Sequence, residues 1–273
     1  MEQHEWRLPS VKYEQYGRYR VPDIIKRLDK LEQEFDGAME TAMGLRILRQ
    51  DMRYYCTPPD FIPFAAPGVD GIHYCFVTDF GVADRLEEAW VAVVSPMDVN
   101  VIWMVARNLE QFLHVLYTDR DVLYNGFATS EAYRQHVASR EQGARTAEQQ
   151  SVWSRLSDTF ELQEIPDMGV YMDQVREQRA AAVCIHTPDS VGVVPKGCNS
   201  TCQYETITEV SDWMDALEAP SPEIRLAAVR HLQHLREIPD NREVLAQCAN
   251  VLEALGLHDE SDRLLKTNFR HLF

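Results

Sequence analysis

The chain has 273 residues, of which 45% are hydrophobic and 26% are charged, so its composition is that of a folded protein with one large domain or two small ones. Its 27 basic and 43 acidic residues give a formal net charge of −16, which opposes contact with a phosphate backbone and argues against a nucleic-acid binder. No apolar run approaches the roughly 20 residues of a membrane span, and no signal-peptide pattern occurs at the start. We therefore expect a cytoplasmic protein that binds neither nucleic acid nor membrane.

The first part of the chain predicts an arm followed by two helices. Residues 1–20 are polar with scattered tyrosines, which predicts an irregular, loosely attached arm. Pro22 suits the first turn of a helix that Gly37 is expected to end. Its apolar stripe consists of Ile24, Ile25, Leu28, Leu31 and Phe35. A second helix is expected from about Met39 to Tyr54.

The stretch 57–117 carries the clearest strand pattern. Four prolines exclude a continuous helix at its start and predict an extended approach to a sheet. Asp70-Gly71 permits positive φ, so a turn there is expected to start a strand over 73–78. Runs of β-branched and aromatic residues predict two more strands, over 90–95 and 101–106. Asn108 is placed to cap a helix with one apolar face, which completes a β-β-β-α unit.

Within this stretch, a proline-rich entry is followed by PFAAPGVDGIHYCFVTD, a strand ending in VSPMD, and VARNLEQFLHVL. This order of segments resembles members of the SMI1/KNR4-like (SUKH) superfamily over residues 57–117. The resemblance implies an α+β binding domain without a catalytic signature. Many bacterial members look like immunity proteins that neutralise polymorphic toxins, and fungal members look like regulators of cell-wall synthesis. The resemblance therefore implies a protein partner.

The middle of the chain predicts further helices and a second hairpin. Residues 130–150 are rich in Glu, Gln, Arg and Ala, which is typical of an exposed helix or a partly mobile connector. A buried face returns over 153–162, and another helix is expected around 170–182. Strands are expected over 182–186 and 191–194, joined by a turn at Thr187-Pro188-Asp189.

The C-terminal part predicts helices almost throughout. After a loop at 195–202, a short strand near 204–207 and a helix near 210–217 are expected. Ser221-Pro222 is a good helix start, and later helices are separated by Pro239-Asp240-Asn241 and by Gly256. This three-helix tail is similar to a HEAT-like or TPR-like hairpin, although it shows no repeat period.

These elements together predict an α+β fold, with a mostly antiparallel sheet covered by helices and an α-helical C-terminal subdomain. The expected division is a domain over 1–218 and a helical subdomain over 219–273. We favour a tail packed on the sheet over a free-standing protein-binding tail.

Groups that carry chemistry are few. Cys198 and Cys202 with His186 have zinc-ligand side chains, but the Cys-x3-Cys spacing lacks a second cysteine pair, so we expect reduced thiols or an incidental disulfide and no metal. Phosphate-binding glycine motifs, GxSxG and HExxH are absent, so no cofactor is expected. His73 and Asp70 form the one tempting proton-transfer pair, but a turn aspartate and a hydrogen-bonded histidine explain them better.

Three functions remain open. The first is a non-enzymatic protein-binding module, with a toxin-neutralising immunity protein as its narrower form, whose acidic and aromatic face covers a basic toxin domain. The residues expected on that face are Asp70, His73, Tyr74, Asp79, Phe80, Asp84, Glu87 and Glu88. The second is an enzyme that uses His73 with Asp70 in a cleft, and the third is an intracellular adaptor that binds through the helical tail.

Overall fold

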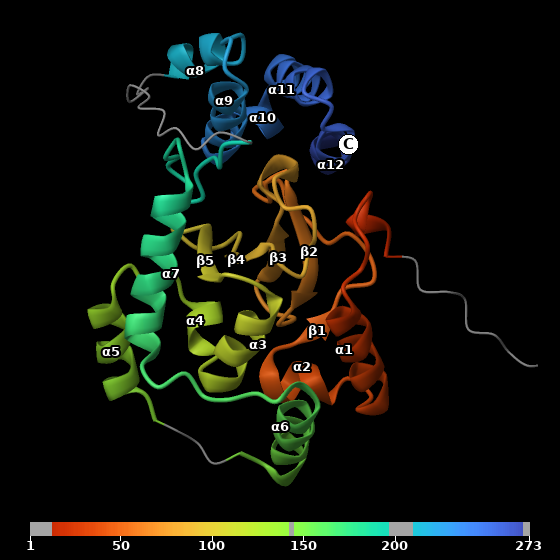
Figure 1. Ribbon diagram of the computed structural model, residues 1–273, viewed down its shortest axis with the longest axis vertical. Coiled ribbons are helices and arrows are strands. Elements are labelled where there is room, and N and C mark those ends of the chain that lie inside the picture. Colours follow the sequence, from red (N-terminus) through yellow and green to blue (C-terminus); the bar gives the residue numbers. More distant parts are fainter. Residues whose placement is uncertain (1–12, 142–144, 197–209, 270–273) are drawn as a thin grey trace, which may run out of the picture.

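The computed structural model describes residues 13–141, 145–196 and 210–269 of the chain. It contains one antiparallel sheet in which each strand pairs with the next along the chain, as Figure 1 shows. The strands are β1 (Arg46–Ile47), β2 (Phe61–Ala66), β3 (His73–Val77), β4 (Trp90–Val94) and β5 (Ile102–Ala106). The predicted α+β class and the last three strands are confirmed, and β1 and β5 form the two edges of the sheet.

Helices cover both faces of this sheet. The helices in the first two thirds of the chain are α1 (Asp23–Glu34), α2 (Ala38–Met43), α3 (Leu109–Thr118), α4 (Asp121–Tyr124), α5 (Ser130–Ser139), α6 (Ala147–Phe160) and α7 (Met168–Ala182). Side chains such as Tyr74 and Phe76 belong to the core shared with α1, α2 and α3. Cys75 and Val77, between and beyond them, face the opposite way and share a core with Val175 of α7.

The second predicted helix is much shorter than expected. Helix α2 ends after six residues, and Gly44 takes a left-handed φ of 68° as its C-cap. A Cβ atom at Gly44 would lie 2.1 Å from the Tyr124 hydroxyl oxygen, so a larger residue does not fit. The chain then enters β1, where Ile47 pairs with Ala65. The prediction of a helix as far as Tyr54 is therefore wrong.

Strand β2 lies within the segment for which the sequence predicts only an extended approach. Pro63 is inside the strand, and the register with β3 shifts between Pro63 and Ala65. Proline has no N–H to give to a ladder, so a position at such an irregularity is one that a sheet tolerates. All six residues of β2 are buried between two neighbouring strands, although proline normally argues against such a place.

The predicted second hairpin is wrong in detail. Residues 182–194 form a single bridge between Ile185 and Val193 and no regular strands. The turn between them is present, and its side chains hold it, because the Thr187 hydroxyl donates to Asp189 and the Asp189 carboxylate accepts the Val191 N–H at 3.0 Å. The strand expected near 204–207 lies outside the described residues.

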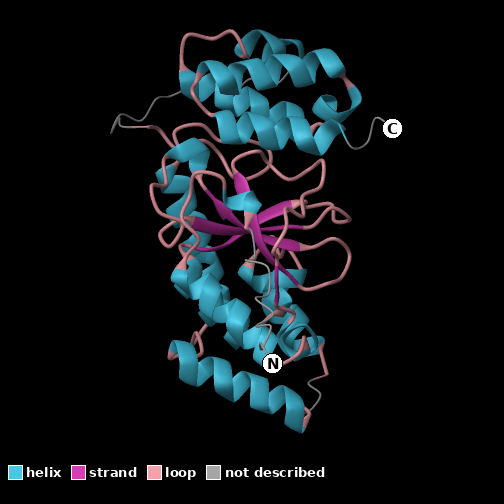
Figure 2. Ribbon diagram, turned by 90° about the vertical axis from the view of Figure 1, so that its right-hand side faces the viewer, coloured by secondary structure: helices cyan, strands magenta, loops and turns pink. Residues whose placement is uncertain are grey.

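The C-terminal helices form a separate layer beyond one end of the sheet (Figures 1 and 2). They are α8 (Val210–Ala216), α9 (Pro222–His234), α10 (Glu237–Asp240), α11 (Arg242–Ala254) and α12 (His258–Phe269). Trp213 of α8 stacks on His231 of α9 with 4.1 Å between ring centroids, so the expected boundary between residues 218 and 219 divides one hydrophobic core. Within the described ranges, every helix is too short or too polar to cross a bilayer.

The segment 13–20 is anchored, in contrast to the loose attachment that the sequence predicts. Tyr16 is 1% exposed. The Arg18 guanidinium donates to both carboxylate oxygens of Glu260 in α12, at 2.9 and 2.8 Å. Burial of an aromatic ring and a bidentate ion pair therefore hold this segment between the sheet and the C-terminal layer. The remainder of the predicted arm lies outside the described residues.

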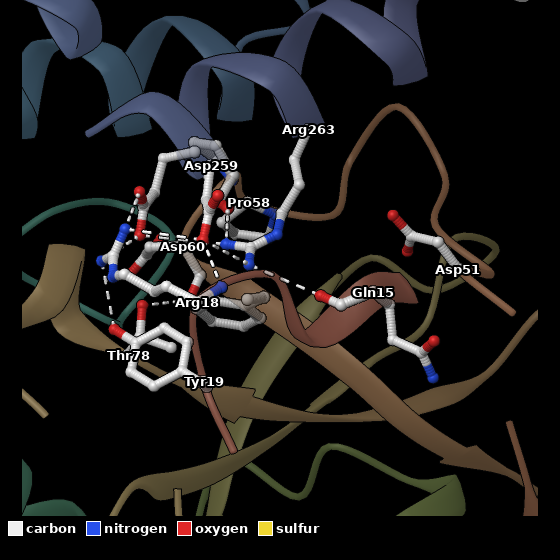
Figure 3. A network of polar contacts seen from close by, with 12 residues as sticks. Gln15, Arg18, Tyr19, Asp51, Pro58, Asp60, Thr78, Asp259 and Arg263 are labelled. Carbon is white, nitrogen blue, oxygen red and sulfur yellow. Dashed lines mark hydrogen bonds and ion pairs between the residues drawn. The ribbon is translucent and has the colours of Figure 1, made fainter. Parts of the chain in front are cut away.

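Buried polar contacts join the C-terminal layer to the loop that precedes β2. Arg230 of α9 donates to Asp60 at 2.6 Å, and neither side chain is accessible to solvent. Arg263 of α12 donates to the Pro59 and Gln15 carbonyls at 3.3 and 3.4 Å, and Figure 3 shows it reaching toward Gln15. Because a buried charge costs several kcal/mol when unpaired, these contacts fix one relative position of the two layers. The C-terminal helices are packed on the sheet and do not form a free tail.

Candidate functional site: a groove along strand β5

A groove with a volume of about 490 Å³ lies along β5, between α7 on one side and residues 126–128 on the other, with residues 183–192 at one end. We call it the β5 groove. Figure 1 shows α7 running alongside this edge of the sheet. Apolar side chains dominate its lining, among them Met104, Val115, Phe127, Met168, Tyr171 and Met172. A largely apolar, open cavity of this size has the dimensions of a site for a drug-sized ligand or a short peptide.

Strand β5 presents unpaired backbone groups to the β5 groove. The Ser95 N–H donates to the Val101 carbonyl at 2.8 Å, so Val101 and, two residues later, Trp103 direct their backbone groups toward β4. Ile102 and Met104 alternate with them, so the N–H and the C=O of each of these two residues point away from β4. No hydrogen bond joins these four backbone groups to another residue in the described part of the chain.

Trp103 forms the wall opposite α7. Its indole N–H donates to the Val122 carbonyl at 2.9 Å, which fixes the ring against the end of α4. A Cβ atom at Gly126 would lie 3.0 Å from the indole ring, so a larger residue would fit there only if the ring shifted by a few tenths of an ångström. Trp103 is partly buried and is among the residues that line the groove.

The charged side chains that line the β5 groove are arginines. Arg176 and Arg179 line it together with His186 and neutral polar residues, and none of its described lining residues is Asp or Glu. Arg179 is buried and already donates to both oxygens of Asp79, at 2.9 and 2.6 Å. Arg176 is half-exposed; it donates to the Phe127 carbonyl at 3.1 Å and pairs with the partly exposed Asp173. In a chain with a net charge of −16, a lining without carboxylates favours an anionic occupant.

Half of the predicted contact residues are not at the surface. His73 and Tyr74 are 0% exposed, Phe80 is 3% exposed and Asp79 is 7% exposed. The expectation that these four lie on an exposed binding face is wrong, because the strand and turn that carry them are covered on both sides.

His73 is held as a neutral side chain. Its Nδ1 lies 2.8 Å from the Gly71 carbonyl, which can only accept, so Nε2 accepts from the Thr57 hydroxyl at 2.9 Å. Burial lowers the pKa of His73 to about 4. Asp70 lies exposed in its turn and makes no hydrogen bond to His73. The structure therefore does not form the His73–Asp70 cleft that the enzyme alternative needs.

Asp79 and Phe80 contact the chain's own helices. Asp79 forms the buried ion pair with Arg179 of α7, and Phe80 belongs to the core of the C-terminal layer. The Arg230 guanidinium lies 4.8 Å from the Phe80 ring centroid. Both residues have left-handed backbone angles, with φ of 50° and 53°, which cost energy that these contacts offset. The end of β3 is therefore covered by α7 and by the C-terminal layer, and it is not a free surface.

The other four predicted residues lie where a partner can reach them. Asp70, Asp84 and Glu88 are exposed and Glu87 is partly exposed. Asp70 has a φ of 51°, which confirms the predicted turn. Arg85 lies 3.8 Å from Glu87 and 3.3 Å from Glu88, so it offsets part of the local negative charge. None of the four lines the β5 groove.

Only one of the three residues with zinc-ligand side chains lies in the described part of the chain. Cys198 and Cys202 lie outside the described residues, and His186 is exposed at the mouth of the β5 groove. In the ranges that the structure describes, no cluster of three or more His, Cys, Asp or Glu side chains is arranged to hold a metal ion.

The residues that build the β5 groove carry no sequence signal of their own, because each is ordinary in its own segment. The one usable signal is the strand over 101–106 followed much later by a helix with two methionines and two arginines. No protein-family model and no curated protein matches this chain. The resemblance to the SMI1/KNR4-like superfamily therefore stays a prediction.

Proposed function

We propose that this chain is a non-enzymatic protein-binding module whose β5 groove receives a segment of a partner protein. The observation that carries the proposal is the combination of an apolar groove of about 490 Å³ with unpaired backbone groups along its floor. Apolar walls supply affinity through burial, and free backbone donors and acceptors match those of another chain.

A binding role is preferred to catalysis because the described groove lacks an assembled reactive pair. His186 is its lone imidazole, and no hydrogen bond or ion pair joins it to a carboxylate among the described residues. A general base needs a group that orients it and sets its tautomer. His73, the earlier candidate, is buried away from the groove.

The test uses a blocking substitution with a neighbouring control. Ala180 is exposed on α7 and lines the β5 groove, whereas Ala181 is exposed on the same helix and does not line it. Peptides selected by display on the full chain are expected to lose at least about tenfold in affinity to A180W and to keep their affinity for A181W. Failure to select any peptide, or equal binding by both variants, contradicts the proposal.

The narrower proposal is that the chain neutralises a basic toxin. The positive charge of the toxin would then lie against the exposed insert between β3 and β4. Asp84 and Glu88 remain available for it, since both are exposed. Reversing both to lysine is expected to slow association with a basic partner, with a smaller effect at high salt. A test needs the candidate toxin domain itself; an unchanged association rate at low salt contradicts this form of the proposal.

A further inference from the structure

We propose that the partner segment enters the β5 groove as an additional strand on β5, and that it is apolar with one acidic side chain beside Arg176. This deepens the proposed function and rests on it. The occupant is therefore an extended stretch of another protein chain, recognised by its backbone and by a carboxylate.

The backbone of β5 sets the mode of binding. Ile102 and Met104 hold two N–H groups and two C=O groups directed away from β4, and both residues line the groove. Ile102 is buried and Met104 is partly buried, so the groove is where another chain would reach this edge. An unpaired sheet edge is a template for another strand, and proteins usually cover or charge it when it has no use. Here apolar side chains flank it, so pairing with an added strand buries apolar area as well.

The walls set the side-chain pattern of the segment. Successive residues of a strand point to opposite faces of a sheet. On one side an incoming strand would meet Tyr171 and Met172 of α7, and on the other it would meet Trp103 and Phe127. Since both walls are apolar, we expect consecutive apolar residues in the segment, in contrast to the alternating pattern of a strand with one solvated face.

Arg176 sets the charge of the segment. Arg179 is neutralised by Asp79 inside the protein, whereas the partner of Arg176 is the partly exposed Asp173. An ion pair between partly exposed side chains contributes little, so a carboxylate that arrives in the groove can replace it. The guanidinium has five N–H donors, of which the contacts to Phe127 and Asp173 use two.

The first experiment reads the backbone pairing directly. Hydrogen exchange of the full chain is measured with and without a selected acidic peptide. The Ile102 and Met104 amides are expected to slow by at least about tenfold, while the Trp103 amide, which already faces β4, changes little. In parallel, N-methylation of alternate residues of the peptide is expected to weaken binding at least about tenfold, and methylation of the residues between them is not.

The outcomes separate the two proposals. If the peptide binds in an A180W-sensitive manner but the two amides stay unprotected and methylation shows no alternation, the strand addition is wrong and the groove remains a peptide site. If no peptide binds, both proposals fail. If a long-chain carboxylate such as oleate competes with the peptide and itself binds tightly without protecting either amide, the groove is a site for small amphiphiles and the strand addition is overturned.

The second experiment tests the charge. R176Q is expected to weaken an acidic peptide by roughly fivefold to tenfold and to leave its Glu-to-Gln analogue unchanged. R155Q is the control, since Arg155 lies on α6, also pairs with a carboxylate, Glu34 at 3.6 Å, and is not among the lining residues. Its side chain is 55% exposed, against 37% for Arg176. Equal loss for both peptides would assign Arg176 a structural role at the Phe127 carbonyl and would overturn the assignment of a carboxylate.

Discussion

Two boundaries of the same sheet are completed in different ways. Where β2 begins and β3 ends, the C-terminal helices and α7 supply a partner for each buried charge, as in the pairs Arg230–Asp60 and Arg179–Asp79. Along β5, the described residues leave two N–H and two C=O groups of Ile102 and Met104 without a partner. The docked boundary also keeps buried polar atoms without a hydrogen-bond partner, namely Asp60 Oδ1 and Arg230 Nε and Nη1, but its opposite charges are paired. The added strand proposed above would pair the backbone groups of the β5 boundary.

The largest effect on stability is expected from removing the C-terminal helices that cover this end of the sheet. A chain that ends at Ala219 loses α9 to α12 and exposes Asp60 and Phe80, which are 0% and 3% exposed in the full chain. The lost burial exceeds the 5–15 kcal/mol that typically separates folded from unfolded protein, so we expect loss of the whole fold. Near-UV circular dichroism and urea unfolding measure this. A truncated chain that still unfolds cooperatively would support a separable tail and the adaptor function.

The next largest effect concerns the buried pair at that boundary. R230M leaves the Asp60 carboxylate buried without its cation, which is expected to destabilise the protein by about 3–5 kcal/mol. The double variant D60N/R230M removes both charges and is expected to recover most of that loss. Urea unfolding of the two variants and the parent measures these changes in the free energy of unfolding. Additive losses in the double variant would mean that the contact acts through packing and not through charge.

A smaller effect is expected from pH, through His73. Its pKa is lowered from 6.5 to about 4 in the folded protein, so its contribution to stability is complete above pH 6.5 and is lost as pH falls toward 4. The full loss is about 3.4 kcal/mol, since pKa values of 6.5 and 4 differ by 2.5 units at about 1.36 kcal/mol each.

Asp60 acts in the opposite direction. Burial raises its pKa from 3.8 to about 6, with Arg230 opposing the rise, so its contribution is present below pH 3.8 and is lost as pH rises through 6. The measurement is therefore the difference between the parent and H73N across pH 7.5 to 4.5. H73N is expected to have the flatter profile, and parallel profiles would show that His73 keeps its ordinary pKa when folded.

The difference between the two boundaries also explains which features could be predicted. Strands β3, β4 and β5 carry β-branched and aromatic residues in short runs, and Asn108 caps the helix after them by accepting the Gln111 N–H, as its position predicts. Strand β2 is missed because Pro63 argues against a strand more strongly than its apolar neighbours argue for one. The early end of α2 is set by Gly44, a local C-cap signal that the longer predicted helix passes over.

The candidate site depends on such distant contacts throughout. Arg179 and Asp79 lie 100 residues apart in the sequence, and nothing local in either segment indicates that they meet. Asp79 and Phe80 look exposed in the sequence because they follow a strand and precede a polar insert, yet α7 and the C-terminal layer cover them. Sequence patterns identify which elements exist, whereas the partners that bury or free a side chain are set by tertiary packing.

The smallest effect on stability is expected at the exposed insert between β3 and β4. Asp84 and Glu88 are exposed, and the only described ion pair of Glu88 is with Arg85, whose side chain is 65% exposed. Substituting both by their amides should change the free energy of unfolding by no more than about 0.5 kcal/mol, because solvent screens such charges.

The same pair of substitutions distinguishes the insert from the β5 groove in binding. Selected groove peptides should bind the D84N/E88Q variant as they bind the parent, since neither residue lines the groove. A basic partner protein should associate more slowly with the variant at low salt and equally at high salt. If the variant also bound groove peptides more weakly, the insert would be part of the groove. The insert and the groove would then not be separate binding surfaces.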